Sequence, residues 1–417
     1  MPLPSVLEKL QAAAPAAEIW WDSSPLVYPA FKESTLALAP DAQTRTRWAA
    51  QLDRFLDTAH PTGSLVRGVT TNPSLMAKSI IEAPETWAPE VREAHLRQAR
   101  PDVRETYWII YQEALRRAAQ VMLPLWRATN GKYGWVSGQL DPRCIFDADA
   151  MLEQGLQLAR IAPNLMVKVP GTRQGYETIR RLVSRGISVN NTLSYSVPQF
   201  TACIRAVEAG LAEARRQGVD TSRWRTVITH MIGRFGTQGD LLDEAAARGM
   251  SLSPREIRLA EIAILKRIQR TIVANGHPVT MLLSSLETDA PETGALSMHL
   301  EETAGAAIAY TCKPSFVADL MRREAECGEL DPGAIDREVP AETLRKLQRL
   351  PYFAKAYDPD GMPPEDFANY GAFITTYAEV ARNARRLVDF VAQHAMAPEA
   401  AEAGEPVLDP AYATAAE

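Results

Sequence analysis

The segment NLMVKVPG at residues 164–171 has the pattern of a buried parallel strand. Its centre, 165–169, is a short apolar run with branched side chains, and a Pro-Gly pair closes it. Residues 173–185 continue with an amphipathic helical pattern, and a second short run, GISVNNTLS, occupies 186–194. A strand, a helix and a strand in this order predict two parallel strands joined by a crossover.

The same alternation extends from this unit toward both ends of the chain. Amphipathic stretches such as 147–161 and 197–217 separate short runs that are bounded by Gly, Pro, Asp or Asn. The eight runs lie at 18–24, 67–73, 133–142, 164–171, 186–194, 226–234, 279–287 and 305–314. Eight strands in this rhythm predict an α/β fold of the (β/α)8 barrel type. An open doubly wound sheet is the alternative, but no glycine-rich phosphate loop follows the first run.

Two spans exceed the repeating unit. Residues 75–132, between the second and third strands, are mostly helical in pattern, and residues 316–397 add further helices, including one at 376–395. Neither span contains a strand pattern. We therefore expect a single barrel over residues 1–397, with a helical insertion at 75–132 and C-terminal helices at 316–397. Residues 398–417 are rich in Ala, Glu and Pro and are predicted to form a flexible tail.

Composition excludes several classes of protein. The chain has 45 basic and 51 acidic side chains, a net charge of −6, so we expect no nucleic-acid partner. The N-terminal segment carries charges where a signal peptide needs an apolar stretch, and no run approaches the roughly 18 apolar residues of a membrane span. The widely spaced cysteines predict reduced thiols in a cytoplasmic protein and no metal site; they are Cys144, Cys203, Cys312 and Cys327.

Lys168 interrupts the apolar strand at 165–169 and is one of only nine lysines, against 36 arginines. With a period of two residues it shares one face with Met166, while Leu165 and Val167 lie on the other. Both faces of a barrel strand are buried, so an inward lysine loses hydration and its pKa falls. A neutral amine can attack a carbonyl carbon, which makes Lys168 a candidate Schiff-base residue. The alternative is a lysine that reaches from the strand end to solvent or to a single carboxylate.

Polar side chains recur near the carboxyl ends of the neighbouring predicted strands. Any one of them alone is typical of a turn or a helix cap. Because the carboxyl ends of barrel strands converge on one mouth, we expect them to line a common site. They are Asp22, Asn72, Gln139, Asn190, Thr192, Thr229 and Ser284.

Four of these segments together resemble the signature segments of the transaldolases. The resemblance extends from about Asp22 to Lys313 and implies a (β/α)8 barrel whose Schiff-base lysine lies on the fourth strand. It further implies an enzyme that moves a dihydroxyacetone unit from a ketose phosphate to an aldose phosphate, without a metal or an organic cofactor. The segments are GVTTNPSL at 68–75, VSGQLDPR at 136–143, NLMVKVPGT at 164–172 and GISVNNTLS at 186–194.

The resemblance implies three catalytic roles. Lys168 would form the Schiff base with the donor ketone, and Asp22 would be the acid/base that takes the proton from the C4 hydroxyl of the donor. Thr192 would hold the catalytic water.

The resemblance also implies a set of substrate-binding residues. Asn72 and Asn190 would hydrogen-bond the hydroxyls of the donor, and Arg234 would bind the substrate phosphate through its planar guanidinium. Thr229 stands where the family usually has a serine, and with Ser284 it is expected to line the substrate site.

The segment VSGQLDPR, which contains the third predicted strand, departs from the typical transaldolase pattern at Gln139. Typical members have a Glu there that shuttles protons through the bound water, whereas a Gln amide cannot titrate. Gln at this position resembles the fructose-6-phosphate aldolase branch, which pairs it with a tyrosine where this chain has Met231. The adjacent His230 should point to the opposite face of its strand, where it packs or caps.

Three functions are compatible with these residues. The first is a transaldolase-type enzyme of the pentose phosphate pathway, and the second is a specialised aldol-type enzyme that uses the same lysine on an unusual sugar or keto substrate. The third is a non-catalytic sugar-phosphate-binding descendant, which the retention of Asp22 and Lys168 argues against. The expected partners are small-molecule sugar phosphates, with no membrane, and a homodimer is as compatible with the sequence as a monomer.

Overall fold

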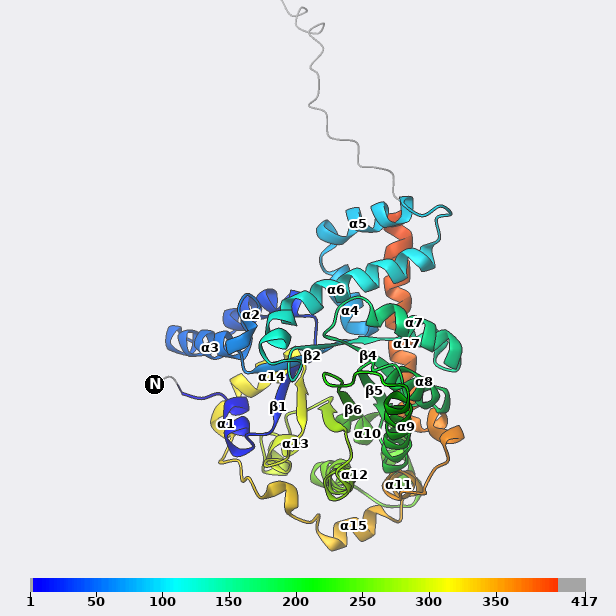
Figure 1. Cartoon of the computed structure of the whole chain (residues 1–417). Coiled ribbons are helices and arrows are strands. Elements are labelled where there is room, and N and C mark those ends of the chain that lie inside the picture. Colours follow the sequence, from blue (N-terminus) through cyan, green and yellow to red (C-terminus); the bar gives the residue numbers. More distant parts are fainter. Residues whose placement is uncertain (1–2, 397–417) are drawn as a thin grey trace, which may run out of the picture.

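The computed structural model describes residues 3–396, and it contains a closed barrel of eight parallel strands (Figure 1). Each strand pairs with the next along the chain, and β8 pairs with β1. The predicted (β/α)8 barrel is therefore confirmed. The strands are β1 Glu18–Trp21, β2 Val66–Thr70, β3 Trp135–Gln139, β4 Leu165–Pro170, β5 Val189–Ser194, β6 Thr226–Met231, β7 Thr280–Ser284 and β8 Ala309–Cys312.

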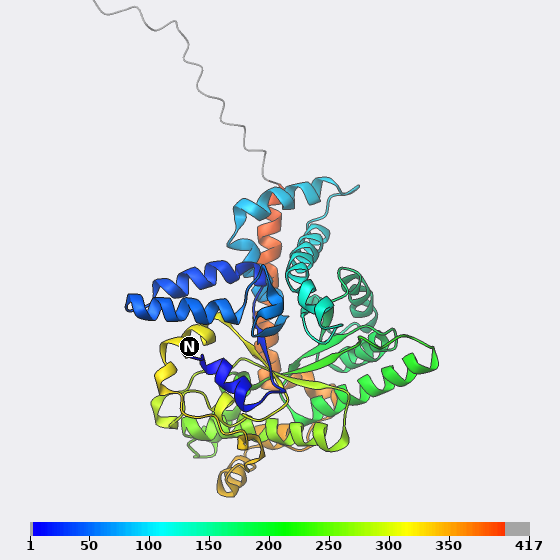
Figure 2. The same cartoon turned by 60° about the vertical axis from the view of Figure 1, so that its left-hand side comes forward.

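Helices surround the barrel, most of them in the connections between successive strands (Figure 2). Helix α1 (Val6–Ala13) precedes β1, and the helices of the first three connections are α2 Tyr28–Ala37, α3 Ala42–Phe55, α4 Pro73–Ile81, α5 Pro84–Leu96, α6 Val103–Ala128 and α7 Ala148–Ala159. The next connections contain α8 Arg173–Val183, α9 Val197–Arg216, α10 Ile232–Gln238, α11 Leu241–Ala247, α12 Pro254–Asn275 and α13 Met298–Glu301. After β8 come α14 Pro314–Arg322, α15 Ala341–Leu347, α16 Pro351–Tyr357 and α17 Gly371–Ala395.

The turn that ends the lysine-bearing strand is determined by local sequence. Thr172 caps α8, because its Oγ1 accepts a hydrogen bond from the backbone N–H of Gly175 at 2.9 Å. A Cβ on Gly175 would lie 2.0 Å from the carbonyl oxygen of Pro170, so only glycine fits where the helix packs against the end of β4. These contacts fix the point at which β4 stops and therefore the height of Lys168 in the barrel.

The interior of the barrel is built in two layers. An apolar layer closes the amino-terminal end. One of its tryptophans, Trp20, packs directly against Gly68, where a Cβ would lie 2.5 Å from the indole ring. Two residues further along each strand the same face becomes polar. The lower layer includes Trp20, Trp135, Met166, Val227, Leu282 and Ala309, and the layer above it contains Asp22, Thr70, Ser137, Lys168, Thr229, Ser284 and Thr311.

The helical insertion and the last helix pack on each other. Helix α17 contacts α4, α5 and α6, and it also contacts α10, β5 and the 3-10 turn η3 (Pro142–Cys144) (Figure 1). Since α4, η3 and α10 directly follow β2, β3 and β6, α17 runs across the carboxyl ends of the strands. It begins five residues before the predicted helix at 376–395. The predicted tail, 398–417, lies outside the described residues.

Between residues 3 and 396, no helix combines the length and the apolar character needed to cross a bilayer.

Candidate active site

Lys168 is buried inside the barrel on β4, with 5% of its surface exposed. Its Nζ donates a hydrogen bond to the carbonyl oxygen of Thr71 at 3.0 Å. Burial lowers the pKa of the amine to about 8; the charge of Asp22 opposes this shift and that of Arg234 adds to it. An appreciable share of the lysine is therefore the neutral, nucleophilic amine near physiological pH.

Asp22 follows β1 directly and is partly exposed at the mouth of the barrel. Its backbone N–H donates to the carbonyl oxygen of Cys312, and its Oδ1 accepts a hydrogen bond from Thr70 Oγ1 at 2.6 Å. Burial raises the pKa of the carboxyl group, while the charge of Lys168 and the Thr70 hydrogen bond lower it. A carboxyl group with a raised pKa more readily accepts a proton and can later return it, which is what a general acid/base does.

Gln139 pairs in register with Lys168 across β3 and β4. Its backbone is fixed by Tyr111, whose hydroxyl accepts from the Gln139 N–H at 3.0 Å and donates to the Gln139 carbonyl at 2.9 Å. The residue is 4% exposed, and within residues 3–396 its side-chain amide forms no hydrogen bond. The residue that pairs with Lys168 on β3 therefore carries an unpaired amide.

Asn190 is the register partner of Lys168 on the other side, on β5. Its Nδ2 donates to Ser137 Oγ at 2.9 Å, and its Oδ1 accepts from Thr229 Oγ1 at 2.7 Å. These bonds fix the orientation of the amide, and one Nδ2 hydrogen is left for a ligand. Thr229 therefore lines the site through its contact with Asn190.

Thr192 and Tyr195 both approach the sulfur of Met231. The Thr192 Oγ1 lies 4.0 Å from Met231 Sδ, and the hydroxyl of Tyr195 lies 3.5 Å from the same sulfur. Burial raises the pKa of the Tyr195 hydroxyl, so this group stays protonated. Sequence reasoning did not identify Tyr195, because Leu193 has a positive φ of 57° and the β5–β6 register shifts there, which interrupts the two-residue period.

Asn72 and Ser284, two further predicted site residues, differ in that the first has a hydrogen-bond partner and the second has none in the described part of the chain. Asn72 caps α4, with its Oδ1 accepting from the backbone N–H of Leu75 at 2.9 Å, so its Nδ2 and the second lone pair of Oδ1 remain to bind a substrate. Ser284 lies on the inner face of β7, and its buried Oγ has no hydrogen-bond partner in the described part of the chain. A buried hydroxyl without a partner is costly, and a ligand in the barrel would satisfy it.

The profile of the "Transaldolase/Fructose-6-phosphate aldolase" family matches residues 53–355, which include β2 to β8 and Lys168. The chain belongs to this family. A transaldolase of Mycobacterium leprae is 32% identical over 244 residues, 55% of this chain and 63% of that protein. A transaldolase of Mycobacterium ulcerans is 33% identical over 177 residues, 42% of this chain and 47% of that protein. The matched regions thus span less than two thirds of either relative.

Arg234 joins the family-matched region to the last helix. Its guanidinium in α10 donates to both carboxylate oxygens of Glu379 in α17, at 2.6 and 3.3 Å, and to Gln238 Oε1 at 3.0 Å. Burial lowers the pKa of Arg234, but the carboxylate more than offsets this and the pKa lies above its usual value. The transaldolase-type phosphate role of Arg234 stays a prediction, since a protein carboxylate holds the guanidinium here.

The side chain of His230 lies on the outer face of β6, as the two-residue period predicts. It is fully buried, and neither ring nitrogen has a partner among residues 3–396. Its ring meets that of Phe200 edge-on, with 5.8 Å between centroids, and burial lowers its pKa to about 4. The imidazole is therefore neutral and packs against the helices outside the barrel.

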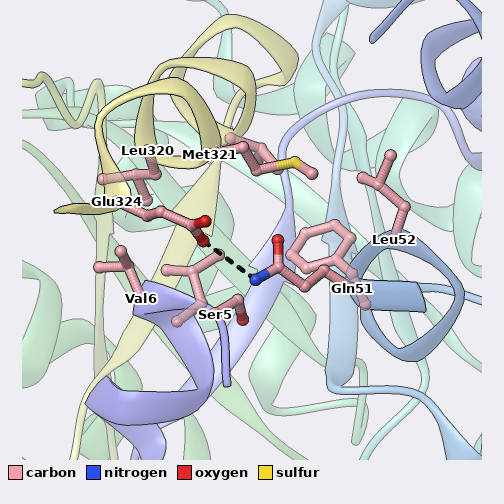
Figure 3. A pocket seen from close by; sticks show the side chains of 10 residues that line it. Ser5, Val6, Gln51, Leu52, Leu320, Met321 and Glu324 are labelled. Atoms are coloured by element: carbon pink, nitrogen blue, oxygen red, sulfur yellow. Dashed lines mark hydrogen bonds between the residues drawn. The ribbon is translucent and has the colours of Figure 1, made fainter. Parts of the chain in front are cut away.

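One pocket away from the barrel mouth lacks comparable chemistry. A small pocket between α1, α3 and α14 is mostly apolar, with a hydrogen bond of 3.0 Å from Gln51 to Glu324 across it (Figure 3). It is bordered by the end of α14, which places it toward the amino-terminal end of the barrel, opposite the mouth. Within residues 3–396, no three His, Cys, Asp or Glu side chains are grouped so that they could hold a metal ion.

Proposed function

We propose that this chain is a Schiff-base enzyme of the transaldolase type, which transfers or cleaves the dihydroxyacetone unit of a ketose through Lys168. The observation that carries the proposal is the buried amine of Lys168, with its pKa lowered to about 8 and with Asp22 acting on it across the barrel. Perturbed groups that converge in a barrel mouth are typical of catalytic sites.

The proposed reaction begins at the amine. The neutral Lys168 attacks the ketone carbonyl, and the carbinolamine loses water to become an iminium ion. Asp22 takes the proton of the C4 hydroxyl while the bond between C3 and C4 breaks. The electron pair of that bond moves into the iminium, which leaves an enamine on Lys168 and releases an aldehyde.

The second half reverses these steps with a new partner. In transfer, the enamine carbon attacks an acceptor aldehyde and Asp22 returns its proton to the new hydroxyl. In simple cleavage, the enamine takes a proton and water hydrolyses the imine. Asn72, Asn190 and Ser284 supply donors or acceptors for the hydroxyls of the unit, and Thr192 would hold the water.

The names of the relatives favour transfer over simple cleavage. Both relatives quoted above are named transaldolases. In that role the chain would use fructose 6-phosphate as donor and erythrose 4-phosphate as acceptor, in the pentose phosphate pathway of the cytoplasm. The decisive assay follows the formation of sedoheptulose 7-phosphate from these two sugars, with fructose 6-phosphate alone as the cleavage control.

Gln139 supports a second candidate, a specialised aldol-type enzyme acting on an unusual sugar or keto substrate. An amide beside Lys168 can orient water but cannot shuttle a proton, so this site is not equipped like a typical transaldolase. No transfer between the two sugar phosphates, combined with imine formation from other ketones, would favour this second function.

A further inference from the structure

A buried group of charged side chains lies between α12, α10 and the connection from β7 to β8, where α12 packs against α10 (Figure 1). Its centre is Glu261 of α12, which is fully buried. Its Oε1 accepts a hydrogen bond from the backbone N–H of Gly236 in α10 at 3.1 Å. Its Oε2 accepts from Arg258 at 2.9 Å and lies 2.9 Å from Nε2 of His299, which is also fully buried. Both carboxylate oxygens thus have partners, as a buried charge requires.

The hydrogen bonds of His299 determine which of its nitrogens carries the proton. Its Nδ1 accepts from the backbone N–H of Glu287 at 3.2 Å, so this nitrogen is unprotonated. Nε2 therefore carries the hydrogen and donates it to Glu261. The imidazole links the buried carboxylate to the residues that follow β7.

Each of these contacts leads to a cation at the mouth of the barrel. Gly236 lies two residues after Arg234 in α10, and the side chain of Glu287 accepts a hydrogen bond from Lys313 Nζ at 2.6 Å. Burial raises the pKa of Asp22, and the charges of Arg234 and Lys313 both lower it, so the two cations act at the same site.

Arg234 keeps a donor for a ligand. It binds Glu379 and Gln238 through its two Nη atoms, and between residues 3 and 396 its Nε has no hydrogen-bond partner. The side chain of Glu379 is 41% exposed, so it can rotate away without any shift of α17. The guanidinium is therefore able to receive an anion.

The junction between α10 and the β7–β8 connection is closely packed. Ser285, directly after β7, has a positive φ of 60°. A Cβ on Gly233 would lie 2.2 Å from the carbonyl oxygen of Ser285, so the first turn of α10 packs on this residue. A left-handed residue other than glycine persists only where surrounding contacts hold it. The hydrogen bonds of Glu261 and His299 supply such contacts to both segments.

We propose that Glu261 is a positioning residue, which together with His299 holds Arg234 and Lys313 where they receive the anionic end of the substrate. The inference rests on the proposed function, in which that end is the phosphate of a ketose phosphate. Glu261 itself touches neither the substrate nor Lys168 and acts through α10 and the β7–β8 connection.

The role requires two acceptor oxygens. An amide at position 261 has one acceptor and two donor hydrogens, so it can accept from Gly236 or from His299, and not from both. His299 cannot adapt by moving its proton, since its Nδ1 accepts from Glu287. In Glu261→Gln we therefore expect one of the two segments to lose its contact with α12.

The test compares the full-length parent with Glu261→Gln and with Glu256→Gln, the same substitution on the same helix. Glu256 bonds to Ser253 and Lys346, and in the described part of the chain it makes no hydrogen bond to α10 or to the β7–β8 connection. Fructose 6-phosphate is titrated by isothermal calorimetry, and borohydride trapping of dihydroxyacetone, which has no phosphate, is measured on the same samples. We expect Glu261→Gln to bind fructose 6-phosphate about tenfold more weakly and to trap dihydroxyacetone within about twofold of the parent rate, with Glu256→Gln unchanged in both.

A merely structural role of Glu261 would change both readouts together. The proposal is overturned by an unchanged affinity in Glu261→Gln, by an equal loss of affinity and trapping, or by a parent that does not bind fructose 6-phosphate. If the parent binds the sugar phosphate but traps no dihydroxyacetone, the Schiff-base function fails, and the comparison of affinities still decides the role of Glu261. His299→Asn leaves every charge in place but is too short to reach Glu261. It carries the test, with the same expected result, if Glu261→Gln does not fold.

Discussion

Asp22 and Lys168 change each other's ionisation from opposite sides of the barrel interior. Burial is the largest influence on both groups, raising the pKa of the carboxyl group and lowering that of the amine to about 8. The interaction between their charges works against burial in each case. The two groups are thereby brought closer in pKa, as a nucleophile and a proton carrier working at the same pH require.

The rate of imine formation should therefore depend on pH. With dihydroxyacetone, we expect the rate to rise with a midpoint near 8 and to level off above it, as Lys168 loses its proton. In Asp22→Asn the midpoint should move to lower pH, because the negative charge that favours the ammonium form is gone. Borohydride reduction stopped at set times across pH 6–10 would measure both curves. An unchanged midpoint in the variant would show that the charge of Asp22 does not affect the pKa of Lys168.

The free energy of unfolding should also depend on the ionisation of Lys168, and it should increase with pH. Lys168 binds its proton less tightly in the folded chain, with a pKa of about 8 against 10.5 for the unperturbed side chain. Its contribution to the free energy of unfolding should therefore increase as the pH rises from 8 to 10.5. Urea unfolding of the parent and of Lys168→Met at several pH values would show this slope, which the variant should lack.

Asp22→Asn should separate bond cleavage from imine formation. The amide cannot take the C4 proton, so turnover should fall by roughly 10²–10⁴. The amine of Lys168 remains, so the variant should still form the trapped adduct. Turnover near that of the parent would remove Asp22 from the mechanism.

Gln139→Glu tests the departure from the typical transaldolase. The residue lies beside Lys168 in register, so a carboxylate there can take a proton from the carbinolamine and return it. It should also raise the pKa of Lys168, which works against the reaction at neutral pH. We expect the gain in proton transfer to be larger, and so a faster transfer with the donor that the parent uses best. A slower variant would show that the site relies on another proton route.

Gly68→Ala tests the apolar layer below the site. The added Cβ would lie 2.5 Å from the ring of Trp20, which is fully buried and cannot move freely. We expect the free energy of unfolding to fall by about 1–3 kcal/mol. Gly63→Ala is the matched control, because nothing lies within 4 Å of its added Cβ, and urea unfolding should find it close to the parent.

The barrel could be predicted because it depends on local patterns. Buried runs bounded by turn residues located all eight strands, and the two-residue period placed Lys168 inside and His230 outside. The strand ends were less certain: the first strand stops at Trp21, so Asp22 is held by its bond to Cys312 and not by strand pairing.

Contacts between distant segments could not be predicted from these patterns. Arg234 and Glu379 are 145 residues apart, and only the packing of α17 across the mouth brings them together. Tyr195 approaches Met231 because of the left-handed backbone at Leu193, which no periodicity indicates. The sequence around Asn72 also does not show that its Oδ1 caps α4 while its Nδ2 stays available to a ligand.

The most direct test of the central claim is to locate the trapped adduct. The protein is reduced with borohydride in the presence of dihydroxyacetone and, separately, fructose 6-phosphate, and its peptides are analysed by mass spectrometry. We predict an adduct on the peptide containing NLMVKVPGT, lost in Lys168→Met and retained in Lys313→Met, whose lysine lies at the same mouth. An adduct on Lys313, or one that survives in Lys168→Met, would contradict the assignment of Lys168 as the Schiff-base residue.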